Sequence, residues 1–112
     1  MYTMTRATPS VSVVELQSKA LDASNSAAFK ESLREVIAGQ PQLVLDLTQV
    51  GFVDSSGLGA ILSALRQANA AGGDIKLARL NRPVRVVVEL TRMHRIFEIF
   101  ESVDAAVSAF DA

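Results

Sequence analysis

The segment from residue 43 to residue 65 constrains the fold more than any other part of the chain. It begins with an apolar run at 43–47, which indicates a buried strand. It ends in an amphipathic helix pattern, with apolar residues at Leu58, Ile61, Leu62 and Leu65. Small and polar residues lie between the two: Asp54, Ser55, Ser56, Gly57 and Gly59. A strand-to-helix turn of this kind places hydroxyls at the surface, at the positive end of a helix dipole, where a modifying enzyme can reach them and phosphate is tolerated.

The rest of the chain alternates strand and helix patterns around this segment. Strand patterns cover 10–16, 42–47 and 74–79, with a short edge strand within 96–100. Helix patterns cover 26–38, 57–70, 82–93 and 103–110. This alternation predicts one α/β domain over residues 1–112, with a mixed, mostly parallel sheet of about four to five strands packed with about four helices. We expect residues 1–9 to be a flexible or extended N-terminal segment.

The third helix opens at Arg82 and Pro83, and its buried side is predicted to carry Val86, Leu90 and Met93, with Val87 adding to it. Arg85 and Glu89 are spaced for an ion pair between residues i and i+4.

Composition limits the functions that the chain can have. Its length of 112 residues suits one domain, and its net charge of −1 gives no electrostatic reason to expect nucleic acid as a partner. Cysteine is absent and His94 is the only histidine, so we expect neither a metal nor a cofactor. The sequence has no signal-peptide pattern and no apolar run that would span a bilayer, so we expect a cytoplasmic protein without membrane insertion.

The run Asp54-Ser55-Ser56-Gly57-Leu58-Gly59, together with its apolar flanks, resembles the signature of bacterial anti-sigma-factor antagonists. These are single-domain proteins of the STAS class (sulfate transporter and anti-sigma factor antagonist). Weaker similarity lies at 21–27 and 83–97, so the resemblance covers roughly residues 10–110. It implies that the α/β domain is a single STAS domain.

The resemblance also implies a function without enzymatic activity. In the family, the unphosphorylated antagonist binds an anti-sigma factor that is a serine kinase, and the sigma factor is released. Phosphorylation abolishes this binding, and a serine phosphatase restores it. By its position in the motif, Ser55 is the implied phosphate acceptor, and we expect Ser56 to cap the helix through its hydroxyl. The implied partner-binding residues are Asp22, Asn25, Asp54, Ser56 and Gly57. We expect either a monomer or a weak dimer, and the sequence does not decide between them.

Alternatives stay open for these residues. Asp22, Asp54 and Ser55 are also of the types that serve as plain cap or turn residues. The same fold serves as an accessory subunit of membrane transporters, and a partner-switching module can act on an output other than a sigma factor. An enzyme with Ser55 as nucleophile is disfavoured, because no Gly-x-Ser-x-Gly elbow surrounds it and His94 is the only imidazole base.

Two segments depart from the family pattern. The family often has Gly-Glu-Leu-Asp where this chain has Lys19-Ala20-Leu21-Asp22, and Thr-Gly-Leu where it has Thr91-Arg92-Met93. A glycine at the second place favours a left-handed end to the third helix, a conformation that Arg92 adopts only at some cost.

Overall fold

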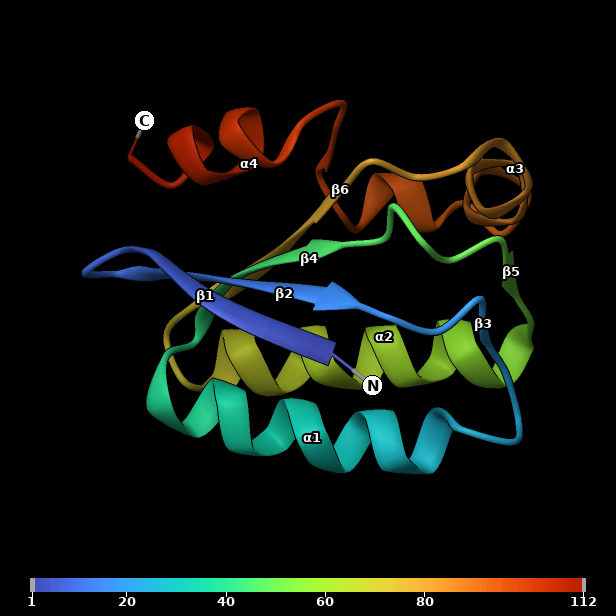
Figure 1. Cartoon of the computed structure of the whole chain (residues 1–112), viewed down its shortest axis with the longest axis horizontal. Helices are drawn as coiled ribbons and strands as arrows, with labels where there is room; N and C mark the ends of the chain where they lie inside the picture. The colour runs from blue at the N-terminus through green and yellow to red at the C-terminus, as the bar shows by residue number, and fades with distance from the viewer. Residues whose placement is uncertain (1, 112) are drawn as a thin grey trace.

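The computed structural model of the chain describes residues 2–111. Figure 1 shows a sheet between two helical layers, with α1 and α2 side by side on one face and α3 and α4 on the other. In chain order the elements are β1 (Tyr2–Thr8), β2 (Val11–Leu16), β3 (Ala20–Leu21), α1 (Ser26–Gly39), β4 (Gln42–Asp46), β5 (Phe52–Val53), α2 (Ser55–Ala70), β6 (Asp74–Ala78), α3 (Arg82–Leu90), the short 3-10 helix η1 (Met93–Arg95), β7 (Ile99–Phe100) and α4 (Val103–Ala109).

The main sheet has five strands in the order β1-β2-β4-β6-β7. β1 runs antiparallel to β2, and the remaining neighbours are parallel. The predicted α/β domain with a mixed, mostly parallel sheet is therefore confirmed. β3 and β5 form a separate parallel pair, which the sequence did not predict because two residues carry no periodicity.

The central strand β4 explains why the sheet needs a helical layer on each face. Successive side chains of a strand point to opposite faces. Leu43 and Leu45 enter the large core against α1 and α2, whereas Val44 enters a smaller core. That smaller core lies against α4 and contains Val11, Val44, Ala78 and Ala106. The apolar residues Leu43, Val44 and Leu45 thus follow one another because the strand is buried on both faces.

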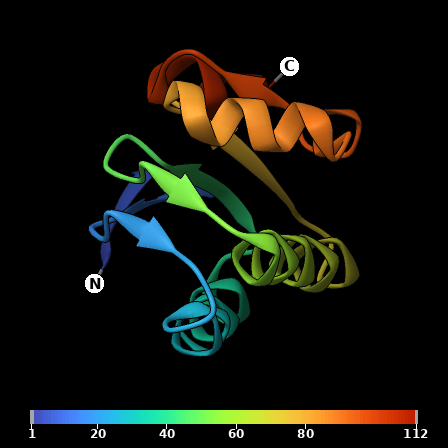
Figure 2. The ribbon, with the colours of Figure 1, turned by 90° about the vertical axis from the view of Figure 1, so that its right-hand side faces the viewer.

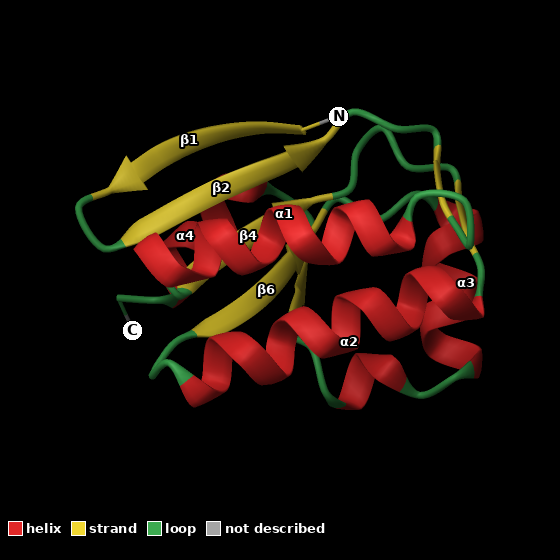
Figure 3. Ribbon diagram, turned by 90° about the horizontal axis from the view of Figure 1, so that it is seen from below, coloured by secondary structure: helices red, strands yellow, loops and turns green. Residues whose placement is uncertain are grey.

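The N-terminal residues form part of the sheet. We expected residues 1–9 to be flexible or extended, and Tyr2–Thr8 are an extended strand that pairs with β2 over its whole length, apart from a shift in register between Arg6 and Thr8. Figure 3 shows β1 at the outer edge of the sheet, to the side of α1.

The buried side of α3 differs from the prediction. Val84 and Val88 are buried, whereas Val86 is 43% exposed and Leu90 is 78% exposed. The prediction was wrong because it counted Met93 as part of the same helix. Met93 is buried, but α3 ends at Leu90 and the chain turns at Arg92, which has φ 61°. Arg92 thus adopts the left-handed conformation that the family pattern implied, and the periodicity of α3 does not extend to Met93.

The ion pair made by Arg85 differs from the one predicted. Arg85 does not pair with Glu89 but with Glu101, at 3.2 Å between Nη2 and Oε1. Within residues 2–111, no helix is both long and apolar enough to cross a membrane.

Candidate functional site

The turn before α2 is organised by Asp54. Its backbone is extended, and its Oδ1 atom accepts a hydrogen bond from the Gly57 backbone N–H at 2.9 Å. This is the geometry of an N-cap, in which a side-chain oxygen satisfies an amide of the first helical turn. Our expectation that Ser56 caps the helix is therefore wrong, because Ser55 and Ser56 are already the first two residues of α2. Both serines are exposed.

The second oxygen of Asp54 joins this turn to a loop that is distant in sequence. Oδ2 accepts a hydrogen bond from the Ala23 N–H at 3.2 Å, and the Asp54 N–H donates to the Leu21 carbonyl at 3.3 Å. One carboxylate thus caps α2 and holds the loop that follows β3. The sequence showed Asp54 as a candidate cap but gave no signal for the contact with Ala23.

Asp22 and Asn25 brace this loop from within. Asp22 Oδ1 accepts from the Ser24 N–H at 2.9 Å and from the Ser24 hydroxyl at 2.6 Å. The hydrogen bond from the Ser24 side chain is the main reason that the pKa of Asp22 is lowered, since it stabilises the carboxylate. Asn25 accepts from the Asp22 N–H at 2.9 Å and donates to the Ala20 carbonyl at 2.8 Å. Asn25 precedes α1, but its side chain closes the loop instead of capping that helix.

The parallel pair β3–β5 brings the two segments together. Ala20 lies opposite Phe52 and Leu21 lies opposite Val53, so the loop after β3 and the turn after β5 emerge at the same end. Figure 2 shows these strands side by side beside the start of α2. The structure therefore places Asp22, Asn25, Asp54, Ser55 and Ser56 in one region.

Gly57 has a structural role that the sequence did not reveal. It is buried, and a Cβ atom at this position would lie 2.2 Å from the Leu21 carbonyl oxygen. The glycine lets α2 pack directly against the backbone of β3. Gly59 differs from it, because it is exposed and a Cβ atom there would meet nothing within 4 Å.

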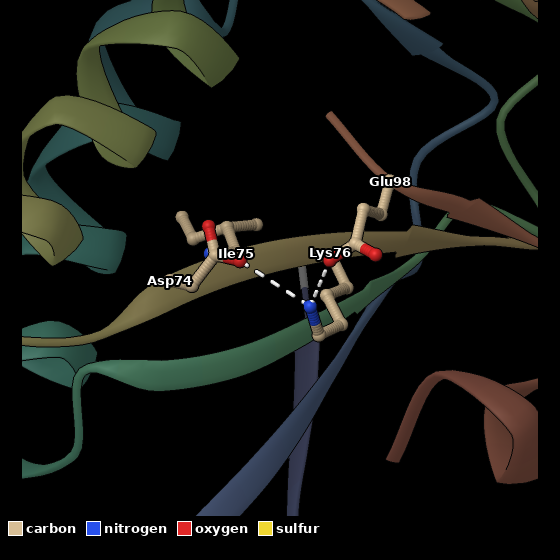
Figure 4. Close-up of polar contacts among 4 residues, drawn as sticks. All are labelled: Asp74, Ile75, Lys76 and Glu98. Carbon is tan, nitrogen blue, oxygen red and sulfur yellow. Dashed lines mark hydrogen bonds and ion pairs between the residues drawn. The ribbon is translucent and has the colours of Figure 1, made fainter. Parts of the chain in front are cut away.

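A second polar cluster lies away from this turn, on β6. Lys76 is a polar residue of this strand, yet it is only 6% exposed. Figure 4 shows its ammonium group between Asp74, at 3.3 Å, and Glu98, with which it forms an ion pair. The same group lies 4.7 Å from the centre of the Phe110 ring. Burial lowers the pKa of Lys76, but hydrogen bonds to Glu98 and Asp74 outweigh it, and the net pKa is raised.

No group of acidic or histidine side chains within residues 2–111 has the arrangement of a metal site. The site around Ser55 is an exposed surface built from a braced loop and the first turn of a helix.

Comparison with known proteins shows the family to which the chain belongs. The model of the STAS domain family matches residues 2–106. The chain belongs to the STAS domain family. A relative from Bordetella bronchiseptica, assigned as an anti-sigma factor antagonist, is 32% identical over 80 residues, which are 71% of this chain and 69% of that protein.

Solved structures of STAS proteins share the fold over nearly the whole chain. One from Thermotoga maritima, also assigned as an anti-sigma factor antagonist, superposes with a TM-score of 0.87 at 25% identity and covers 99% of this chain and 95% of its own. The anti-sigma factor antagonist SpoIIAA in its unphosphorylated form superposes with a TM-score of 0.82 and covers 99% and 96%. At 18% identity, that likeness concerns the fold alone. SpoIIAA also has a structure in its phosphorylated form.

Proposed function

We propose that this protein is an anti-sigma factor antagonist that acts by phosphorylation-controlled partner switching. The unphosphorylated form binds an anti-sigma factor with serine kinase activity, and the sigma factor is released. Phosphorylation of Ser55 abolishes this binding, and a serine phosphatase restores it. The observation that carries the proposal is the exposed Ser55 at the start of α2, beside a capping carboxylate and a braced loop. The relatives assigned as anti-sigma factor antagonists support it.

The acceptor that we propose is Ser55, and its hydroxyl is accessible on the surface of α2. Residues four apart lie on the same face of a helix. The residue four positions after Ser55 is Gly59, which is exposed and has no side chain, so a kinase can approach the Ser55 hydroxyl along an open face. Gly59 is also three positions after Ser56 and both serines are exposed, so our choice of Ser55 rests on its place in the motif, directly after Asp54.

The charge of the phosphate supplies the switch. Phosphorylation adds about −1.5 to −2 units of charge. At the N-terminus of α2 the helix dipole favours this charge by about 0.3–1 kcal/mol, so the domain stays folded. A partner that covers the neutral Ser55 hydroxyl would instead have to desolvate a dianion next to the Asp54 carboxylate, which is costly. Binding is therefore lost without a change of fold.

The surface that we propose for the partner consists of Asp22, Asn25, Asp54 and Ser56 around Ser55. Gly57 contributes by letting the turn lie close to Leu21, since it is buried itself. This function needs no cofactor and no catalytic group of the chain, and it places the protein in the bacterial cytoplasm. The output is a sigma factor or another target of the same kind of switch.

Phosphate mapping tests the proposal. The protein is incubated with ATP and the serine kinase of its own host, and the modified residue is located by mass spectrometry. We expect phosphate on the wild type and on Ser56→Ala, and none on Ser55→Ala. Ser55→Ala should still bind the kinase, whereas Ser55→Asp should bind it weakly and keep the unfolding temperature of the wild type. Phosphate on Ser56, or a Ser55→Asp variant that unfolds, would contradict the mechanism.

A further inference from the structure

The two edges of the main sheet differ in how they are protected. A strand at an edge presents unpaired N–H and C=O groups, which can pair with another strand. The edge strand β7 has only two residues, so it offers little to pair with. The edge strand β1 has seven residues, Tyr2–Thr8, and residues 3–7 are exposed. It contains no proline, so its protection against pairing is limited to the single charge of Arg6 and the irregularity between Arg6 and Thr8.

Both faces of the sheet are open beside β1. One groove, of about 210 Å³, is lined by Tyr2, Met4 and Arg6 together with the end of α1. Another, of about 310 Å³, is lined by Thr3, Thr5 and Ala7 together with the start of α4. The residues of β1 thus alternate between the two grooves, so a strand added at this edge would find room for its side chains on both faces.

The sequence of β1 identifies a suitable partner strand, because Thr3-Met4-Thr5 reads the same in both directions. We propose that β1 pairs antiparallel with β1 of a second copy of this chain, around a twofold axis at Met4. In this register each Met4 lies opposite the other Met4, and each Thr3 lies opposite a Thr5. Each Tyr2 lies opposite an Arg6, which allows the guanidinium group to contact the ring. Threonine pairs across strands are favourable as well, so the interface is self-complementary.

This dimer is independent of the proposed switch. β1 is an edge of the main sheet, whereas Ser55 lies at the end of the molecule formed by β3 and β5 (Figures 1 and 2). Both copies therefore keep the Ser55 surface free for a partner. An interface of one strand pair and its flanking side chains is at the low end of interface sizes, and we expect a dissociation constant of the order of 100 µM.

Sedimentation equilibrium with charge variants at the twofold axis tests the proposal. Met4→Glu and Met4→Lys each place like charges opposite one another, and each should be monomeric where the wild type dimerises. An equimolar mixture of the two should regain a dimer, because opposite charges then face each other. Asn69→Glu adds the same charge at an exposed position of α2 and should dimerise like the wild type. A wild type that stays monomeric up to about 1 mM, or a mixture that stays monomeric, would overturn the proposal.

Cross-linking gives a second readout that does not depend on added charge. The chain has no cysteine, so Met4→Cys introduces a single thiol. Directly opposite residues of an antiparallel pair have Cβ atoms about 4.5–5.5 Å apart, which is close enough for a disulfide after a small adjustment. Under mild oxidation Met4→Cys should form a covalent dimer at least about tenfold faster than Asn69→Cys. Equal rates for the two variants would show that the strands do not meet at Met4.

Discussion

At the scale of single residues, the turn depends on two groups that the sequence presents in the same short motif. Asp54 satisfies an amide of α2 and an amide of the neighbouring loop with its two carboxylate oxygens. Gly57 makes room for the Leu21 carbonyl. Ser56, by contrast, is exposed and caps nothing. A substitution at each of these residues tests its role separately from the others.

The two glycines of the motif should respond differently to the same change. Gly57→Ala places a methyl group 2.2 Å from the Leu21 carbonyl oxygen, which is backbone and cannot move aside freely. We expect it to lower the free energy of unfolding by about 1–3 kcal/mol, as overpacking does. Gly59→Ala meets nothing within 4 Å and should raise the free energy of unfolding by up to about 1 kcal/mol. Urea unfolding of both variants measures the difference, and equal effects would contradict the assigned packing.

Removing the cap should also be costly. Asp54→Ala deletes the acceptor for Gly57 and the acceptor for Ala23, so we expect the free energy of unfolding to fall by about 0.5–2 kcal/mol. Ser56→Ala is the matched control and should change it by less than about 0.5 kcal/mol. Thermal or urea unfolding distinguishes the two. A larger loss for Ser56→Ala than for Asp54→Ala would restore the serine as the cap.

At the scale of elements, the helices and strands with many buried residues were the easiest to predict from the sequence. The strand at 42–47 and the helix at 57–70 were predicted because each has many buried residues at a regular spacing. β1 has exposed residues on both faces, so its sequence carries no apolar alternation and only its extended character could be foreseen. The choice between Asp54 and Ser56 as the cap was undecidable from residue type, because both are favoured there and only the backbone separates them.

The buried side of α3 provides a test at this scale. Val88 is 2% exposed and Val86 is 43% exposed, although both are valines of the same helix. Val88→Ala should lower the free energy of unfolding by about 1–2.5 kcal/mol, since it removes two buried methyl groups and leaves a space. Val86→Ala should change it by less than about 0.5 kcal/mol. Chemical unfolding of both variants checks this, and the reverse order would mean that α3 is rotated about its axis.

At the scale of the whole molecule, Lys76 connects β6 and the residue before β7 to the segment that follows α4. Its ammonium group contacts Asp74 on β6, Glu98 before β7 and the ring of Phe110 after α4. The cluster therefore holds the C-terminal part of the chain against the edge of the sheet. The strand pattern at 74–79 could not show that Lys76 is covered by Phe110, because that depends on the path of the last residues.

The raised pKa of Lys76 gives this cluster a pH dependence of known sign. A group whose pKa is higher in the folded state binds its proton more tightly there, so it stabilises the fold below its unfolded pKa and loses this effect as pH rises. The ordinary pKa is 10.5, so the contribution should be constant near neutrality and decline above that value. The difference in free energy of unfolding between the wild type and Lys76→Met, measured against pH, should shrink in that alkaline range. A difference that grows with pH there would contradict the raised pKa.

The separate strand pair β3–β5 has a consequence for how such proteins diversify. The loop and the turn that form the proposed partner surface rest on this pair and not on the five-stranded sheet. Substitutions at exposed positions of the loop whose side chains make no bracing contact, such as Ala23, can therefore accumulate without changing any residue of the large core. On the proposed function, a duplicated gene could acquire a new kinase partner while it inherits an intact scaffold. Parallel signalling circuits within one cell could then be insulated from one another by a few surface residues.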